Sequence, residues 1–527
     1  MADRVVTARS AAVAVVTLGL GAAVLPATAG NDAKGAATGC AGTRPVVAHH
    51  ASGRVLAHQP KNLPRACGTT TGYPGAESHL VIRNDGSVVY TPAVLPSGSL
   101  GIGSLPGDQY GDSQSNASPG ALAVTSDKGA HWRLVKPSGV TWNPTDHSDY
   151  VDPASGRMFF EDYGPIPVAP GFGGDQEGPA HVNWSDDLQH WHHTVIRGLT
   201  LPENPRFTSG RAPAGQPKPT GGYPSVTYFC ANTNVGFVSP VIGGRLCYRS
   251  LDGGSTWQQR SVLFTGAAPQ HAECNGQGEV YSAIDGYYPQ PAPNGWLYVM
   301  VACGGKTYLA RSKDEAATFP ILHGQRDPVT LPVQTPGPGD VDGSPELRIT
   351  GDGTFLLSYL KDNRLLMRIS ATHGITWSKA IDVTAPGVTA VMQWTMASNA
   401  RGDVSFAYLG HRKGQLTWDG YVTGSRDVLR GLRSRGGPVF LSGQVNPANR
   451  PLLYGDGVQG SGYLGGTPIP FPPPFNNQMF GNDFIGAAVA PDGSPWGSFT
   501  QDCGPSRQSP GCVKQQDQTR GFAGHLD

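Results

Sequence analysis

A short motif recurs along the chain at nearly constant spacing, and this repeat limits the folds open to the chain more than any other feature. Its form is Ser-x-Asp-x-Gly-x-Thr-Trp, and the best copy spans 250–257. Imperfect copies span 125–132, 184–191, 312–319 and 370–377. The aromatic residues that end the five copies are 58 to 66 residues apart. A repeat of this length indicates similar supersecondary units that pack side by side.

The motif has the chemistry of a structural turn between two strands. Its Asp can accept hydrogen bonds from the backbone N–H groups of the turn that it opens. Its Gly tolerates a backbone conformation that other residues resist, and its aromatic ring can pack under the next strand. A carboxylate committed to N–H groups is a poor proton carrier. The residues predicted to serve structure in this way are Asp127, Trp132, Asp186, Trp191, Asp252, Trp257, Asp314, Phe319 and Trp377.

The segments around the best copy predict four strands per unit. Three strands are expected at 225–230, 235–241 and 245–250, and a fourth follows at 258–264. Four strands in about 60 residues are typical of one blade of a β-propeller. The segments 96–119, 163–180, 201–222 and 462–480 are too rich in Gly and Pro for strands and are expected to be loops.

The expected blades can be counted from the strands that open each unit. Seven such strands are expected, near residues 79, 148, 225, 280, 346, 394 and 484. The last unit offers three strands, and a strand near 44–48 is expected to supply its fourth and close the ring. The predicted fold is therefore all-β, a single propeller of four-stranded antiparallel blades. Seven blades are preferred, and six are the alternative.

Composition agrees with this fold. The 527 residues include 73 Gly and 46 Pro, and both residue types interrupt helices. Lys plus Arg and Asp plus Glu both number 39, so the formal net charge is zero. A globally basic nucleic-acid binder is therefore excluded, and no nucleic-acid partner is expected.

The N-terminus has the features of a secretory signal peptide over residues 1–29. Arg4 and Arg9 precede an apolar run at 11–25, and Ala27-Thr28-Ala29 fits a cleavage site. Later segments lack the apolar length of a membrane span. We expect an N-terminal segment at 30–74 that contains the ring-closing strand, followed by the propeller at 75–527. The mature protein is expected to be a secreted, extracellular monomer.

Eight cysteines in an exported chain favour disulfides. Proximity in the sequence suggests the pairs 40–67, 230–247, 274–303 and 503–512, although sequence alone leaves the connectivity open. A zinc site lacks support because the chain has no Cys-x2-Cys pair, and no cofactor or metal is expected. The predicted disulfide residues are Cys40, Cys67, Cys230, Cys247, Cys274, Cys303, Cys503 and Cys512.

The copies at 125–132, 250–257, 312–319 and 370–377 resemble the Asp boxes of the sialidase-like, or BNR-repeat, β-propeller superfamily. The segment 481–493 also resembles a last-blade sequence of secreted bacterial members. The resemblance implies a propeller over roughly 75–527. The superfamily contains sialidases, other glycoside hydrolases, polysaccharide lyases and propellers without known activity. The Arg-Ile-Pro segment of sialidases is absent from this chain, which argues against exo-sialidase activity.

Propellers usually bind ligands at one mouth of the central channel, where loops enter the innermost strands. Glycoside hydrolysis needs two carboxyl groups there, one of them held protonated. The candidate catalytic residues near the strand openings are Asp149, Glu279, Asp340, Asp342, Glu346 and Asp483. The aromatic candidates for stacking on a sugar are Trp142, Tyr223, Tyr287 and Trp394.

Two functions therefore stay open. The first is a sialidase-like propeller that recognises a glycan at the channel mouth, with hydrolysis of glycosidic bonds as its reaction. The alternative is a non-catalytic propeller that binds a polysaccharide or a cell-surface protein.

Overall fold

The structure is a computed structural model. It describes residues 45–72, 78–91, 122–135, 143–163, 179–200, 202–233, 245–263, 279–280, 289–303, 306–322, 345–415, 417–426, 428–434, 437–454, 485–502 and 519–527.

Seven antiparallel sheets follow one another along the chain, each with four consecutive strands or their equivalent. Blade 1 consists of β3 (His79–Ile82), β4 (Val88–Thr91), β5 (Leu122–Thr125) and β6 (Arg133–Val135). Blade 2 consists of β7 (Asn143–Val151), β8 (Met158–Tyr163), β9 (Pro179–Ser185) and β10 (His192–Thr200). Blade 3 consists of β11 (Pro202–Gly210), β12 (Val226–Thr233), β13 (Arg245–Ser250) and β14 (Gln258–Leu263). Blade 4 consists of β15 (Glu279–Val280), β16 (Gln290–Pro291), β17 (Leu297–Cys303) and β18 (Lys306–Ser312). Blade 5 consists of β19 (Glu346–Ile349), β20 (Phe355–Lys361), β21 (Arg364–Ser370) and β22 (Ile381–Asp382).

The last two blades also include strands from the beginning of the chain. Blade 6 contains β23 (Ala390–Ser398), β24 (Val404–His411), β25 (Thr417–Ser425) and β26 (Val439–Gln444), with β27 (Leu453–Tyr454) and β1 (Val47–His50) added. Blade 7 contains β28 (Gly486–Val489), β29 (Pro495–Asp502), β30 (Thr519–Leu526) and β2 (Ala66–Thr70). A six-residue helix, α2 (Val428–Arg433), follows β25. In the described part of the chain, no helix has the length and apolar character needed to cross a membrane.

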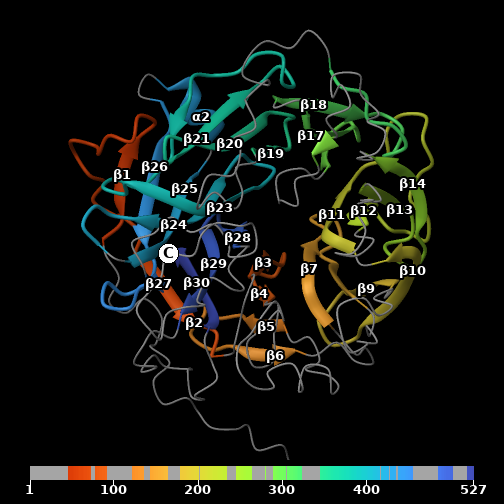
Figure 1. The fold of residues 1–527 in the computed structure, drawn as a ribbon, viewed down its shortest axis with the longest axis horizontal. Coiled ribbons are helices and arrows are strands. Elements are labelled where there is room, and N and C mark those ends of the chain that lie inside the picture. The colour runs from red at the N-terminus through yellow and green to blue at the C-terminus, as the bar shows by residue number, and fades with distance from the viewer. Residues whose placement is uncertain are drawn as a thin grey trace, which may run out of the picture. The chain divides into compact units, whose positions relative to one another are not determined.

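The innermost strands of the blades contact one another in a closed cycle. In blade 4, β15 and β16 both pair with β17, and β16 makes the contacts of the cycle. β3 contacts β7, β7 contacts β11, β11 contacts β16, and β16 contacts β19. β19 then contacts β23, β23 contacts β28, and β28 contacts β3 (Figure 1). The predicted all-β propeller of seven blades is therefore confirmed, and the six-blade alternative is wrong.

Two strand predictions are wrong in position. The strand expected at 44–48 as the ring closure is β1, which pairs with β26 at the outer edge of blade 6. The fourth strand of the last blade is instead β2, which pairs with β30. The segment 201–222, expected to be a loop, contains β11, so blade 3 opens at Pro202 rather than near 225. Its Pro residues lie where a strand tolerates them, because an innermost strand has one edge without a ladder.

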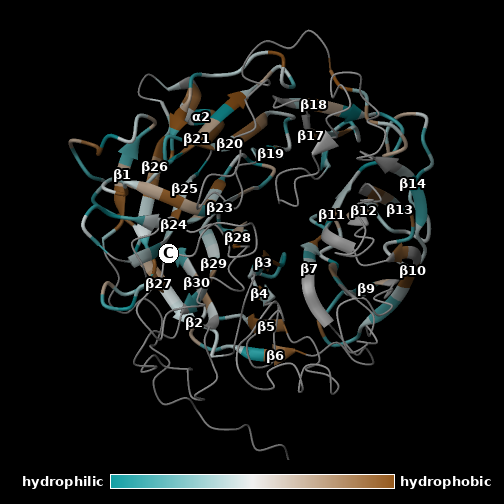
Figure 2. Cartoon of the chain, in the orientation of Figure 1, coloured by the Kyte–Doolittle hydropathy of each residue, from teal (hydrophilic) through white to brown (hydrophobic). Residues whose placement is uncertain are grey.

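Apolar side chains fill the space between neighbouring blades. The largest cluster joins blades 5 and 6 and includes Leu365, Trp394 and Phe406. Another joins blades 2 and 3 around Phe159, Phe207 and Phe229. Figure 2 shows hydrophobic residues along strands such as β20 and β21. Because each cluster is shared by two blades, every blade depends on its neighbours for its core.

The repeat motif forms the predicted turns. The carboxylate of Asp252 accepts the Thr256 backbone N–H at 2.9 Å, and Asp314 accepts the corresponding N–H of Thr318 at 3.0 Å. Burial raises the pKa of Asp252, but hydrogen bonds from Thr256 and Ser250 outweigh it and leave the pKa lowered. The glycine of the best copy, Gly254, has a φ of 99° and its amide binds the Ser250 hydroxyl.

One motif assignment is wrong. In the second copy the turn carboxylate belongs to Asp187, which accepts the N–H groups of Gln189 and His190 at 2.8 Å. Asp186 instead makes a bidentate ion pair with Arg157 of β8's preceding turn, at 2.7 and 2.8 Å. This copy has one residue fewer between its serine, Ser185, and its tryptophan than the best copy has. Alignment on the final tryptophan therefore shifts the carboxylate by one position.

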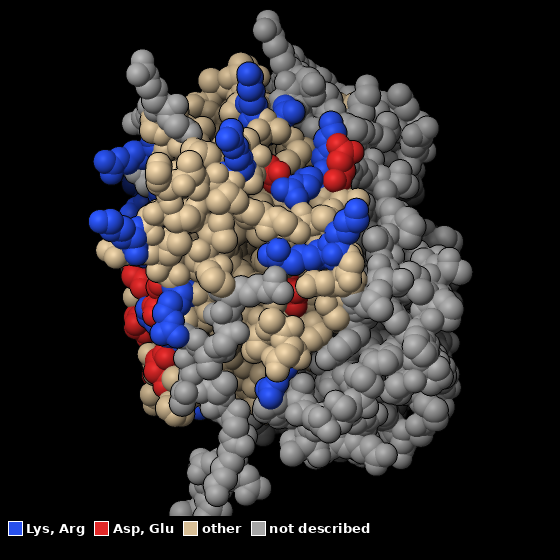
Figure 3. Space-filling view, turned by 90° about the vertical axis from the view of Figure 1, so that its left-hand side faces the viewer, with Lys and Arg blue, Asp and Glu red and all other residues tan. Residues whose placement is uncertain are grey.

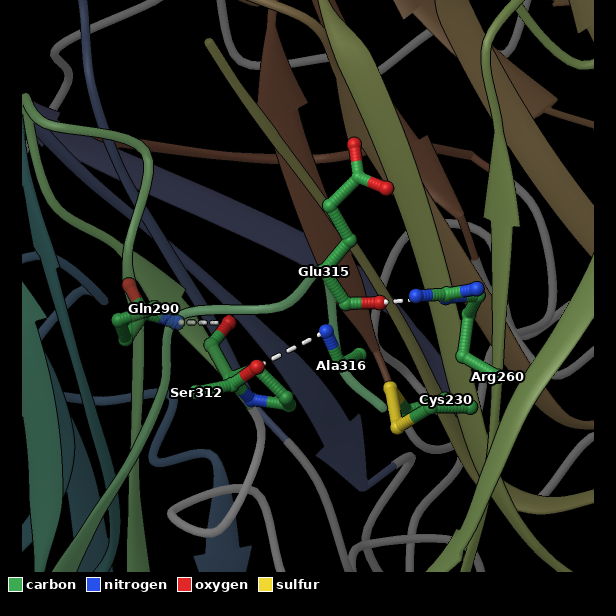
Figure 4. Close-up of a disulfide and its surroundings, with 8 residues drawn as sticks. Cys230, Arg260, Gln290, Ser312, Glu315 and Ala316 are labelled. Atoms are coloured by element: carbon green, nitrogen blue, oxygen red, sulfur yellow. Dashed lines mark hydrogen bonds between the residues drawn. A yellow bond between two sulfur atoms is a disulfide. The ribbon is translucent and has the colours of Figure 1, made fainter. Parts of the chain in front are cut away.

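The predicted disulfide 230–247 is confirmed. It joins directly opposed residues of β12 and β13 and packs in the core between blades 3 and 4. Figure 4 shows it beside the turn of blade 4, where Arg260 donates to the Glu315 carbonyl. Cys67 is also disulfide-bonded. Cys40, Cys274, Cys503 and Cys512 lie outside the described residues, and the side chain of Cys303 is not described.

The outer edge of blade 6 carries exposed basic side chains on segments that contain no acid, although Asp382 of β22 lies beside Ser52 and Gly53. The segments 45–72 and 437–454 contain no Asp or Glu, and β1 pairs with β26 to join them. Arg54, Lys61 and Arg450 are exposed there. Figure 3 views this side of the molecule and shows more Lys and Arg than Asp and Glu.

We expect Gly68→Ala to lower the free energy of unfolding by about 1–3 kcal/mol through overpacking. A Cβ at Gly68 of β2 would lie 2.1 Å from the Val445 carbonyl oxygen, which belongs to the backbone and cannot rotate away. Gly420→Ala is the matched control, because its Cβ would first meet a terminal methyl of Leu452 at 2.5 Å. Urea unfolding of both variants measures the difference. Equal losses would show that β2 is not held closely against blade 6.

Candidate functional site

The innermost strands of four blades carry polar and charged side chains. His79 and Glu346 begin their strands, whereas Asp149 and Arg206 lie further along β7 and β11. Because every blade repeats the same antiparallel order, these strands all begin at one end of the ring, which we call the mouth. The repeat turns lie at the other end. The mouth cluster, as we define it, consists of five residues from four innermost strands. They are His79 of β3, Asp149 of β7, Arg206 of β11, and Glu346 and Arg348 of β19.

Asp149 is the most strongly perturbed acid of this cluster. Its side chain is only 3% exposed. One carboxylate oxygen accepts a hydrogen bond of 2.7 Å from the Thr91 hydroxyl at the end of β4. The other lies 4.0 Å from His79 Nδ1. Asp149 therefore connects blades 1 and 2 at the mouth.

Burial raises the pKa of Asp149 to about 7, although the Thr91 hydrogen bond and the Arg206 charge oppose the rise. Removing a carboxylate from water disfavours its charged form, and one cation at a distance does not compensate here. Near neutral pH, Asp149 is therefore present both as the protonated carboxyl and as the carboxylate.

Glu346 is a second buried acid at the mouth, and its side chain is 3% exposed. Its Oε2 accepts the backbone N–H of Met396 in β23 at 2.6 Å and lies 3.4 Å from Arg348 Nη2. Burial raises the pKa of Glu346, while Arg348, the Met396 N–H and Arg206 favour the ionised form. Glu346 therefore connects blades 5 and 6, and burial disfavours its charged form although Arg348 lies beside it.

Arg206 connects the two acids electrostatically. Its charge lowers the pKa of both Asp149 and Glu346. The three residues come from blades 2, 3 and 5, so the mouth brings together groups that are far apart in the sequence. Two buried carboxyl groups with raised pKa values, and a cation that acts on both, mark this end of the ring as a candidate site for acid–base chemistry.

The structure places the other predicted residues elsewhere. Tyr223 lies at the end with the repeat turns, where its hydroxyl donates to Asp152 at 2.7 Å. Trp394 is 3% exposed in the core between blades 5 and 6. Neither ring lies at the mouth as a stacking surface. Glu279 begins β15, and its side chain is not described. The remaining candidates lie outside the described residues: Asp340, Asp342, Asp483, Trp142 and Tyr287.

Sequence reasoning missed three members of the mouth cluster. His79 and Arg348 lie on strands that were predicted as blade openings, so their positions alone could have identified them. Arg206 follows Pro202 and Pro205 in a segment interpreted as a loop. The two neighbouring Pro residues concealed β11, and its basic residue with it.

Comparisons with known proteins give a fold likeness only. No protein-family model and no curated protein match the sequence. Similar solved structures include a protein of unknown function from Dyadobacter fermentans, with 10% identity over 92% of this chain and 99% of that chain, at a TM-score of 0.39. The NanB sialidase from Streptococcus pneumoniae has 7% identity over 92% of both chains, at a TM-score of 0.38. An α-L-arabinofuranosidase from Fusarium graminearum has 12% identity over 77% of this chain and 99% of that chain, at a TM-score of 0.37. At these TM-scores and identities, the likenesses carry no argument about function.

Proposed function

We propose that this chain is an extracellular, glycan-recognising propeller that hydrolyses glycosidic bonds at its mouth, with Asp149 as the general acid. The observation that carries the proposal is the buried Asp149 carboxyl, whose pKa is raised to about 7 beside Thr91. A glycosidase needs one carboxyl group that still holds its proton near neutral pH. The disulfide between Cys230 and Cys247 supports an oxidising, extracellular location.

The two acids divide the chemistry between them. Protonated Asp149 donates its proton to the glycosidic oxygen as the bond from that oxygen to the anomeric carbon breaks. Glu346, held by Arg348 and the Met396 N–H, stabilises the positive charge that develops on the sugar. It then accepts the proton of the water that adds to the anomeric carbon. Arg206 favours the ionised form of both acids, and Arg348 and the Met396 N–H act on Glu346 in the same direction.

We expect Asp149→Asn to reduce sugar release about 10²- to 10⁴-fold, the usual contribution of a general acid. The measurement is reducing-sugar release from a panel of plant and microbial polysaccharides, and the wild-type rate should fall as pH rises above about 7. Asp352→Asn is the matched control because Asp352 is exposed in a hairpin turn of blade 5, where its carboxylate caps Thr354. Equal rates for wild type and Asp149→Asn would exclude Asp149 as the acid.

A second candidate function is non-catalytic binding of an anionic polysaccharide. The observation that favours it is the basic outer edge of blade 6, where Arg54, Lys61 and Arg450 are exposed without neighbouring acids in their segments. The sugar-release panel also tests it. Salt-sensitive retention on an anionic polysaccharide, together with no sugar release by the wild type, would favour this function over hydrolysis.

A further inference from the structure

Gln393 has an unusual backbone conformation on an innermost strand. It lies in β23, where the pairing with β24 shifts register between Met392 and Trp394. Its φ is 41°, in the left-handed region that residues other than glycine rarely occupy. Irregularities of this kind in strands re-aim a side chain, and strained non-glycine residues occur preferentially at functional sites.

The side-chain amide of Gln393 is buried without a partner. The residue is 3% exposed, and neither Oε1 nor Nε2 has a hydrogen-bond partner among the residues that the structure describes. An unpaired buried amide is unfavourable for folding, and an apolar side chain of similar size would avoid that loss. Folding of the free protein therefore gives no reason for an amide at this position.

Packing around Gln393 does not require the amide either. Met392 belongs to the apolar cluster between blades 6 and 7, and Trp394 belongs to the cluster between blades 5 and 6. The register shift thus directs the residues on either side of Gln393 into two different cores and leaves the glutamine between them.

Gln393 also lies close in the chain to the mouth cluster. Three residues further along β23, the backbone N–H of Met396 binds Glu346. Because β23 runs inward from the mouth, Gln393 lies on the mouth side of this contact. An amide with two unused hydrogen-bonding atoms is therefore carried by the strand that positions one of the two acids.

We propose that Gln393 is a substrate-recognition residue whose amide binds two adjacent hydroxyl groups of a sugar ring. The amide oxygen accepts from one hydroxyl while the amide N–H donates to the next, so a vicinal diol satisfies both atoms at once. A carboxylate or sulfate can only accept, and would leave Oε1 unpaired. The ligand at this position is therefore a neutral, hydroxyl-bearing sugar. The choice of a sugar rests on the proposed function.

The experiment measures binding in the Asp149→Asn background, so that hydrolysis does not interfere. The probes are arabino-, xylo-, cello- and chito-oligosaccharides, titrated by calorimetry. Gln393→Met and Gln393→Glu are each expected to weaken binding at least tenfold, because one leaves the sugar hydroxyls unpaired and the other lacks the N–H donor. Gln444→Met is the matched control, since Gln444 is also buried but lies on β26 and its Nε2 donates to the Asn446 carbonyl. That control should leave binding unchanged.

Thermal unfolding of the ligand-free protein gives a second readout that does not depend on a ligand. Gln393→Met is expected to raise the melting temperature, because it removes the unpaired amide. Gln444→Met is expected to raise it less, because Oε1 of Gln444 is also buried without a partner among the described residues but its Nε2 hydrogen bond is broken. A lower melting temperature for Gln393→Met, or unchanged binding in both Gln393 variants, would overturn the proposal. Weaker binding in these variants, with sugar release unaffected by Asp149→Asn, would instead leave recognition by Gln393 intact and refute the proposed acid.

Discussion

Arg249→Met is expected to lower the free energy of unfolding by about 3–5 kcal/mol, because it leaves a buried carboxylate without its counter-ion. Arg249 lies on β13 of blade 3, and its guanidinium pairs with Glu315 in the repeat turn of blade 4. Arg249 is 8% exposed and Glu315 is 0% exposed. Arg249 binds Glu315 Oε2, and Oε1 has no hydrogen-bond partner within the described part of the chain. Arg249→Met would therefore leave this buried carboxylate without its counter-ion.

The double variant Arg249→Met/Glu315→Gln separates the ion pair from simple packing. Replacing both charges removes the uncompensated carboxylate, so we expect at least half of the lost stability to return. Urea unfolding of the wild type, both single variants and the double variant gives the coupling between the two residues. A loss of stability below about 1 kcal/mol for Arg249→Met is the size expected of an exposed ion pair, and would contradict the prediction made for a buried one.

This ion pair also shows where the repeat departs from its own pattern. In the best copy the turn contains Gly253 and Gly254, whereas in blade 4 Glu315 and Ala316 occupy positive φ values of 55° and 65°. The backbone of blade 4 keeps the same turn, in which the Ala316 amide binds the Ser312 hydroxyl at 3.0 Å. The ion pair to blade 3 and the buried Ala316 compensate for the strain of two residues with side chains in this conformation.

Sequence spacing predicted the turns and the number of blades because the turns are local. A carboxylate and the N–H groups that it accepts lie within four residues, so the motif carries its own geometry. The turn carboxylate of the copy at 184–191 was assigned wrongly because this copy has one residue fewer between Ser185 and Trp191. The hydrogen bonds of Asp187 show the correct assignment. The ring-closing strand was predicted wrongly for a different reason. The last blade takes its fourth strand from the N-terminal segment, as predicted, but the strand is 66–70 rather than 44–48. No local pattern shows which of the two strands in this segment pairs with so distant a partner.

The candidate site was predictable to the extent that it lies at strand openings. Asp149 and Glu346 were both identified from that position. The interaction that unites them depends on Arg206, which lies on a strand that its two Pro residues concealed. The raised pKa of Asp149 could not be predicted either, because it follows from burial by neighbouring blades rather than from the residues beside it in the chain.

We compare the free energy of unfolding of Asp149→Asn with that of the wild type. The difference is expected to favour the variant by about 4 kcal/mol more at pH 8 than at pH 4. The pKa of Asp149 rises from 3.8 in the unfolded chain to about 7 in the folded one, chiefly through burial. The folded state therefore binds the proton more tightly between these values, and wild-type stability falls as pH rises through this window. A change of this size in pKa corresponds to about 4 kcal/mol. Asparagine does not ionise, so the variant lacks this part of the pH dependence.

The measurement is the free energy of unfolding in urea at pH 4, 6 and 8 for the wild type and Asp149→Asn. Asp252→Asn is a control with the opposite sign, because hydrogen bonds from Thr256 and Ser250 lower the pKa of Asp252 despite its partial burial. A carboxylate of that kind stabilises the fold above its unfolded pKa, and the stabilisation is lost as pH falls through the folded value. Asp252→Asn should therefore be destabilised at pH 8 and less so in acid, whereas Asp149→Asn gains on the wild type as pH rises. Parallel pH curves for the wild type and Asp149→Asn would show that Asp149 ionises as in the unfolded chain, and would remove the basis for its role as a proton donor.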